Sequence, residues 1–157
     1  MIKKNYEMEL ALVKSRINPH FLFNTINNID VLIEKDPLKA SAYLNKLSDI
    51  MRFMLYETKP EHILLSRELE YIEKFIELQK IRTANLNYVQ YKTEGNAADI
   101  IIAPMLFIPF IENAFKHAEN TAIDNAISVR FVIEKESISF YRSEEHTSEL
   151  QSHHVIS

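Results

Sequence analysis

The sequence predicts an α+β protein, with a helical first half and a second half in which strands flank a helix. In the first half, apolar residues recur every three or four positions, which is the period of an amphipathic helix. In the second half, residues 86–92 and 127–133 alternate apolar and polar side chains, as half-buried strands do. The period changes near residues 83–86, which predicts two domains, residues 1–84 and 85–141.

The first two helices are predicted from a long pattern and a capping signal. Helical periodicity covers residues 6–34. Asp36 and Pro37 then provide an N-cap and a first helical residue for a second helix. This helix should end near Glu57, because Pro60 disfavours helical backbone just before it.

A third helix is expected to begin near Ser66, which is a candidate N-cap. Glu68 and Glu70 follow it, and negative charge in a first turn interacts favourably with the helix dipole. Apolar residues continue this helix to about residue 83.

The second half begins with the strand at residues 86–92 and a turn at Gly95. Residues 104–117 are expected to form a helix. The strand at residues 127–133 follows, and a last strand is expected at residues 137–141.

Composition excludes several classes of protein. The chain has 157 residues, of which 46% are hydrophobic, so it can bury a core. Without cysteine it has no disulfide and no thiolate site. A net charge of -4 argues against a nucleic-acid-binding surface. Its longest apolar run, residues 100–111, is too short to span a bilayer, and the N-terminus has no signal-peptide pattern.

Residues 142–157 differ from the rest of the chain. They are rich in Ser, Glu and His, show no period, and include His146, His153 and His154. The segment resembles the translation of a sequencing adapter, so we interpret it as a foreign, disordered tail. A metal-binding or hydrolytic protein that uses these histidines is an alternative, which predicts zinc affinity lost on deletion of the tail.

The first candidate site is a histidine in the first helix. At about 100° per residue, four apolar residues fall on one side of that helix: Leu22, Ile26, Ile29 and Ile33. His20, Asn24 and Asn27 fall on the opposite side, and Pro19 should kink the helix beside them. A neutral imidazole can act as a nucleophile, and Asn24 lies one turn away. A surface histidine near a chance kink is the alternative.

The second candidate site lies in the helix at residues 104–117. Asn113, Lys116 and His117 share one side of it, and Glu112 is four residues from Lys116. An amide oxygen is a suitable ligand for Mg²⁺, and a nearby lysine suits a polyphosphate. A surface ion pair between Glu112 and Lys116 is the alternative.

Three segments together resemble the LytS-type sensor histidine kinases over residues 10–141. The phosphoacceptor motif of that family resembles Ile17-Asn18-Pro19-His20-Phe21-Leu22-Phe23-Asn24. Its nucleotide-binding N-box resembles Pro109-Phe110-Ile111-Glu112-Asn113-Ala114-Phe115-Lys116-His117. The helix between them is similar to residues 65–72 and 77–82.

The resemblance implies a role for each matched residue. His20 would accept the γ-phosphoryl group of ATP and pass it to an aspartate of a response regulator. Asn24 would aid dephosphorylation of that regulator. Asn113 would coordinate Mg²⁺, Lys116 and His117 would contact phosphates, and Glu112 would polarise or position the site. These six residues are the candidate site residues, and ATP and Mg²⁺ the implied cofactors.

The resemblance also implies an architecture. A phosphoacceptor hairpin, which dimerises into a four-helix bundle, would precede the first part of a Bergerat-type (GHKL) α/β sandwich that binds ATP. The kinase region would be cytoplasmic, in a parent protein that is anchored in the cell membrane.

The family pattern is incomplete here. The Asp-x-Gly loop and the glycine-rich loops of the family are missing, and Gly95 is the single glycine of the chain. We therefore expect a fragment that binds ATP poorly and does not autophosphorylate efficiently. A non-catalytic module that dimerises and docks a response regulator is the alternative.

Overall fold

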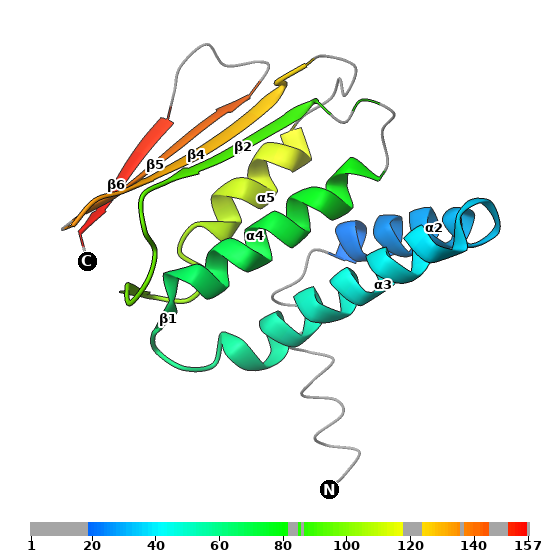
Figure 1. Cartoon of the computed structure of the whole chain (residues 1–157), viewed down its shortest axis with the longest axis horizontal. Helices are drawn as coiled ribbons and strands as arrows, with labels where there is room; N and C mark the ends of the chain where they lie inside the picture. Colours follow the sequence, from blue (N-terminus) through cyan, green and yellow to red (C-terminus); the bar gives the residue numbers. More distant parts are fainter. Residues whose placement is uncertain are drawn as a thin grey trace, which may run out of the picture. The chain divides into compact units, whose positions relative to one another are not determined.

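The computed structural model describes residues 19–81, 85, 87–117, 124–135, 137–144 and 151–156. The chain divides into two compact units, a helical unit (Met1–Glu61) and a sheet unit (His62–Ser157). Figure 1 labels their elements, and each unit is described by itself. The sequence placed the boundary after residue 84, because it grouped all three predicted helices together. In the structure the third helix packs on the sheet unit.

The helical unit contains α2 (Pro19–Lys35), α3 (Pro37–Arg52) and a π-helix, η1 (Phe53–Glu57). Asp36 caps α3, since its carboxylate accepts the backbone N–H of Lys39 at 3.2 Å. This confirms the cap predicted from the sequence. At the end of η1, the Thr58 hydroxyl donates to the carbonyl oxygen of Met54 at 2.8 Å.

The buried face of α2 differs in part from the predicted stripe. Phe21, Thr25 and Ile29 are its buried residues, and they lie one turn apart. Ile29 belongs to the predicted stripe, but Ile26 and Ile33 are 46% and 53% exposed. The sequence pattern follows apolar residues alone, whereas α3 packs on a face of α2 that includes a threonine. Other large apolar side chains of this unit are also exposed: Phe23, Val31, Leu38, Leu44 and Tyr56.

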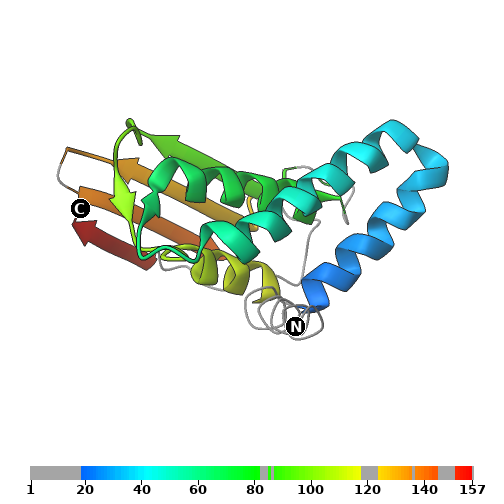
Figure 2. The same ribbon diagram turned by 90° about the horizontal axis from the view of Figure 1, so that it is seen from below.

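The described residues of the sheet unit form two helices and two sheets. Its elements are β1 (Ile63–Leu64), α4 (Leu65–Lys80), β2 (Val89–Glu94), β3 (Ile101–Ile102), α5 (Ile108–His117), β4 (Ile127–Ile133), β5 (Ser137–Glu144) and β6 (Gln151–Ile156). The main sheet has the order β2-β4-β5-β6, and β1 pairs with β3. Both helices lie on the same face of the main sheet (Figures 1 and 2).

The connection from β2 to β4 explains the position of α5. The two strands are parallel, with Val89 opposite Ile127 and Glu94 opposite Val132. Parallel neighbours need a crossover connection, and α5 lies within it. The strands β4, β5 and β6 then pair antiparallel. On this face of the sheet α5 contacts β4 and β5, while α4 contacts β2 and also packs against α5.

The core of the sheet unit contains a cluster of phenylalanine rings. Phe107 lies 5.1 Å from Phe131 and 5.4 Å from Phe140 between ring centroids, and Phe131 and Phe140 are 5.0 Å apart. All three side chains are buried. Along β4, alternate residues are buried, which is the pattern that the sequence predicted for residues 127–133.

Several element bounds differ from the predicted ones. Strand β2 begins at Val89, because Asn87 lies in a turn. Helix α5 begins at Ile108 because Met105, with a φ of 64°, turns the backbone out of the helical region. Helix α4 begins at Leu65, and no side chain caps it, so Ser66 is not its N-cap.

The segment expected to be a disordered tail contains strand residues. Strand β5 continues past Tyr141 to Glu144, and β6 pairs with it from Arg142 opposite Gln151 to Ser137 opposite Ile156. Arg142 is buried, and its Nη1 donates to the carbonyl oxygen of Phe110 at 2.6 Å. An unpaired strand edge exposes N–H and C=O groups, and β6 supplies their partners along β5. His146 lies outside the described residues.

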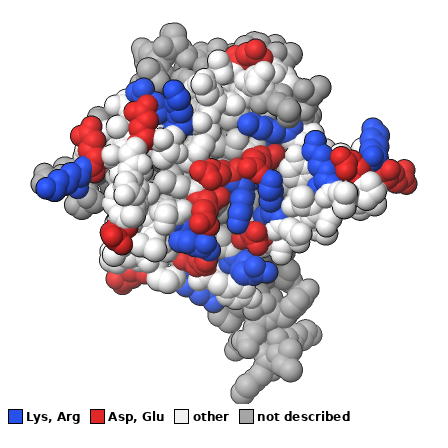
Figure 3. Space-filling view, in the orientation of Figure 1, with Lys and Arg blue, Asp and Glu red and all other residues white. Residues whose placement is uncertain are grey.

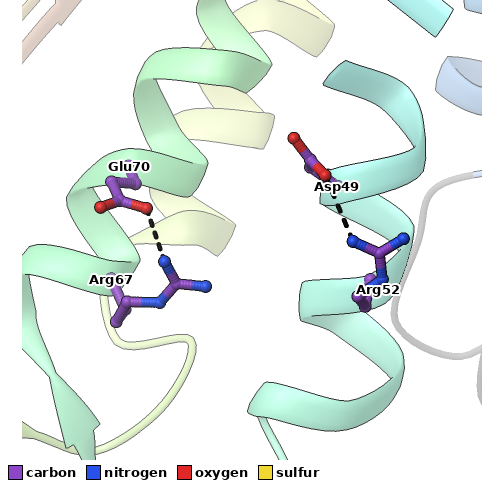
Figure 4. A network of polar contacts seen from close by, with 4 residues as sticks. All are labelled: Asp49, Arg52, Arg67 and Glu70. Carbon is purple, nitrogen blue, oxygen red and sulfur yellow. Dashed lines mark hydrogen bonds and ion pairs between the residues drawn. The ribbon is translucent and has the colours of Figure 1, made fainter. Parts of the chain in front are cut away.

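Charged side chains of both signs are interspersed over α4 in Figure 3. Arg67 and Glu70 form an i,i+3 ion pair at 2.7 Å on this helix, and Asp49 and Arg52 form one at 3.4 Å on α3 (Figure 4). Exposed pairs of this kind contribute about 0–1 kcal/mol. No helix among the described residues has the length and apolar character needed to cross a bilayer.

Candidate functional site

The first candidate residue, His20, lies in the first turn of α2 and is exposed. The amide nitrogen of Asn24 lies 3.3 Å from its Nδ1 and 3.4 Å from its Nε2. The amide can therefore donate to whichever ring nitrogen carries no proton. This confirms the predicted one-turn spacing of the two side chains, with Asn27 also exposed. The segment before Pro19, which includes Ile17 and Asn18, lies outside the described residues.

The second candidate group lies on α5, and the structure separates its members. Asn113 and Lys116 are exposed on this helix. Glu112 is half-buried, and its carboxylate accepts a hydrogen bond from the hydroxyl of Tyr71 on α4. His117 is the last residue of α5, and its side chain lies outside the described part. The N-box residues therefore divide into an exposed pair and an acid that faces α4.

Burial changes the acid–base properties of this helix pair. It raises the pKa of Glu112 from its ordinary 4.5 to about 7, although the hydrogen bond from Tyr71 lowers it in part. Tyr71 is itself buried, and desolvation, together with the charges of Glu112 and Glu68, raises its pKa well above 10.0. Desolvation acts in this direction on both groups because it disfavours their charged forms.

Sequence reasoning missed Glu68 as a residue of this region. Its side chain is fully buried, and its two oxygens accept the backbone N–H groups of Leu106 and Phe107 at 3.2 and 3.1 Å. Burial raises the pKa of Glu68 to about 7, although hydrogen bonds from Phe107, Met105 and Leu106 lower it in part. A glutamate in a first helical turn is ordinary in sequence, so no local pattern singles out this one.

Asn113 and Lys116 have the chemistry that a Mg²⁺–polyphosphate group requires. Mg²⁺ usually keeps several waters and takes one or two protein oxygen ligands together with substrate phosphates. One exposed amide with an exposed ammonium group one turn away fits that description. Among the described residues, no group of three or more His, Asp or Glu side chains is placed to hold a metal ion.

A pocket of about 420 Å³ lies between α4 and β2. It is lined by Glu73, Ile76, Glu77, Lys80, Val89, Gln90 and Tyr91. None of the predicted site residues is among them, so this pocket does not extend the N-box site.

The comparison with known proteins identifies the family to which the chain belongs. The family model of histidine kinases matches residues 8–86, which is half of the chain and includes His20. The chain therefore belongs to the histidine kinase family, and its relatives place it with the LytS type.

Two groups of staphylococcal sensor proteins illustrate the similarity. The sensor protein LytS of Staphylococcus haemolyticus is 32% identical over 78% of this chain, and that of Staphylococcus epidermidis is 30% identical over 85%. The sensor protein kinase HptS of Staphylococcus aureus is 31% identical over 84% of the chain. The chain spans only 21–25% of the length of these relatives.

Proposed function

We propose that this chain carries the phosphoacceptor and part of the nucleotide site of a two-component sensor histidine kinase. His20 accepts the γ-phosphoryl group of ATP and passes it to an aspartate of a response regulator. The observation that carries the proposal is the exposed His20 with Asn24 against its ring, within the segment that matches the family.

The chemistry needs an accessible, neutral imidazole. An unprotonated ring nitrogen of His20 attacks the γ-phosphorus, a P–N bond forms, and the bond to the bridging oxygen of ADP breaks. The aspartate oxygen of the regulator then attacks the same phosphorus, and the P–N bond breaks. Phosphoryl transfer depends mainly on positioning and charge stabilisation. Asn24 orients the ring for the first step, and it is placed to hold a water when the regulator is dephosphorylated.

In this proposal α5 holds the phosphates. When bound, Mg²⁺ neutralises charge on the transferring phosphoryl group. The Asn113 amide oxygen supplies a protein ligand to it, while Lys116 and His117 contact phosphate oxygens. Glu112 acts as a positioning group, because it hydrogen-bonds Tyr71 of α4 rather than lying with the exposed pair.

The proposed partners are a second copy of the chain and a receiver domain. Several large apolar side chains of α2 and α3 are exposed, and Phe23, Ile33 and Leu38 are more than half exposed. Large apolar side chains that are exposed on a helix can become buried in a protein interface. A dimer through these helices is consistent with the four-helix bundle of the family. The chain would act on the cytoplasmic side of the cell membrane, as the kinase region of an anchored sensor.

The experiment that separates a kinase from a docking module is an NMR titration of the ¹⁵N-labelled chain with MgATP. The kinase proposal predicts saturable shifts of the Asn113 and Lys116 amides, with a dissociation constant on the order of 1 mM. Asn113→Asp should weaken binding at least tenfold, because a carboxylate repels the phosphates.

The matched control is Asn45→Asp, since Asn45 is also an exposed helical asparagine but lies on α3. It should leave the titration unchanged. Absence of shifts on α5 at MgATP concentrations well above the expected dissociation constant, or equal binding by Asn113→Asp, would favour the docking module.

A further inference from the structure

The turn that leads into α5 is shaped to receive an anion. Met105 has a φ of 64°, in the left-handed region that non-glycine residues rarely adopt. A residue of this conformation in a turn directs successive backbone N–H groups to one side, where they form an anion-binding concavity. Here the N–H groups of Met105, Leu106 and Phe107 converge at the N-terminal end of α5.

The anion in this concavity is a side chain of the same chain. Glu68 of α4 lies 38 and 39 residues before Leu106 and Phe107, and each of its carboxylate oxygens accepts one of their N–H groups. The side chain is fully buried, and its bond to the N–H of Phe107 is buried as well. A negative charge at a helix N-terminus also interacts favourably with the helix dipole.

Helix α5 is therefore held by α4 at two points. Glu68 holds the turn at its start, and Tyr71 donates to Glu112 one turn further along. Asn113 follows Phe107 by six residues, about 9 Å along a helix axis. Because a helix of this length moves as a rigid element, the bond at its start also fixes where Asn113 and Lys116 lie.

We propose that Glu68 is a positioning residue for the nucleotide site. Its carboxylate accepts the N–H groups of Leu106 and Phe107 and thereby fixes the position of α5, and with it the positions of Asn113 and Lys116. This inference rests on the proposed nucleotide-binding function of α5. This role requires that both carboxylate oxygens of Glu68 accept a hydrogen bond. A glutamine has the same length, but its amide nitrogen cannot accept, so one buried N–H loses its partner.

The test compares Glu68→Gln with two control variants of the whole chain. Glu70→Gln makes the same change on the exposed side of α4, where Glu70 pairs with Arg67 (Figure 4). Tyr88→Phe removes a different buried hydrogen bond of the sheet unit, from the Tyr88 hydroxyl to the carbonyl oxygen of Gln79. It therefore reports a loss of stability that does not act through the start of α5.

Two readouts are taken at pH 8: the amide shifts of Asn113 and Lys116 without nucleotide, and the dissociation constant for MgATP. The proposal predicts that Glu68→Gln shifts both amides and weakens MgATP binding at least fivefold. Glu70→Gln and Tyr88→Phe should stay within twofold of the unmodified chain. If Glu68→Gln does not fold, Glu68→Asp, which keeps a carboxylate on a shorter side chain, is measured by the same criteria.

Unchanged binding in Glu68→Gln, or an equal loss in Tyr88→Phe, overturns the proposal. If the unmodified chain does not bind MgATP, the proposed nucleotide site fails, and the amide shifts alone decide the positioning role. Shifts of Asn113 and Lys116 in Glu68→Gln but not in Tyr88→Phe support it, and no shift overturns it.

Discussion

At the scale of single residues, two carboxyl groups distinguish the sheet unit: Glu68 is fully buried and Glu112 is half-buried. Burial raises the pKa of Glu68 and of Glu112 to about 7, although each accepts hydrogen bonds. Desolvation of a charge is costly, and neutral donors offset it only in part. Both groups lie between α4 and α5, so the ionisation of this helix pair changes near neutral pH.

This predicts a stability that falls as pH rises. The folded chain keeps a proton on Glu68 up to about pH 7, whereas the unfolded chain loses it near its ordinary pKa of 4.5. Between these values the unfolded state binds fewer protons, so the free energy of unfolding decreases with pH. The contribution of Glu68 reaches at most roughly 3 kcal/mol.

Urea denaturation from pH 4.5 to 8 measures this contribution. Glu68→Gln should show a shallower decrease than the unmodified chain, while Glu70→Gln should keep the original slope. If the free energy of unfolding changed with pH by the same slope in all three proteins, Glu68 would not be the source of the pH dependence.

Residue by residue, the sequence was informative where contacts are local. The spacing of His20 and Asn24 predicted a contact across one helical turn, and the structure has it. The same reasoning placed Glu112 beside Lys116, but burial against Tyr71 determines where Glu112 lies. The partners of Glu68 are backbone groups far along the chain, which no spacing rule identifies.

At the scale of elements, Gly95 has a position that only glycine fits. Its φ is 99°, and a Cβ there would collide with the carbonyl oxygen of Ile133 at the end of β4. Gly95→Ala should therefore lower the stability of the sheet unit by roughly 2 kcal/mol or more.

Thermal unfolding measured by circular dichroism tests this expectation. Lys92→Ala, at an exposed position of β2, should change stability by less than about 0.5 kcal/mol. Equal unfolding temperatures for Gly95→Ala and Lys92→Ala would contradict the close approach of Gly95 to Ile133.

The apolar surface of α2 predicts a dimer that one charge disrupts. Ile33 is 53% exposed, and in a two-fold interface a substitution appears twice. Ile33→Glu should convert the proposed dimer to a monomer and leave the helical content unchanged. Sedimentation analysis measures this, with Ser41→Glu, at an exposed polar position of α3, as the control. A monomeric unmodified chain, or a dimeric Ile33→Glu, would rule out this interface.

Periodicity predicted most helices and strands, but it did not always predict which face of each is buried. Alternation along residues 127–133 identified β4 because one side of that strand is buried throughout. The buried face of α2 was predicted only in part, since Thr25 is buried and Ile26 exposed. The start of α5 was missed because the backbone of Met105, rather than a breaker residue, ends the preceding turn.

At the scale of the whole molecule, the sequence predicted the protein family and the α+β fold class. It grouped α4 with the helices before it, because an apolar helix face does not reveal what covers it. The structure assigns α4 to the sheet unit, where it holds α5. The strands after Tyr141 were also not predicted, since that segment has no apolar period.

In the proposed function, His20 is the residue that carries the phosphoryl group. The most direct measurement is phosphoryl transfer from the chain, first phosphorylated with phosphoramidate, to the receiver domain of a response regulator that serves a LytS-type kinase. We expect rapid transfer to the receiver aspartate, no transfer from His20→Gln, and unchanged transfer from His62→Gln, since His62 is exposed but lies outside the motif. Undiminished transfer from His20→Gln, or none from a chain phosphorylated on His20, would contradict the account.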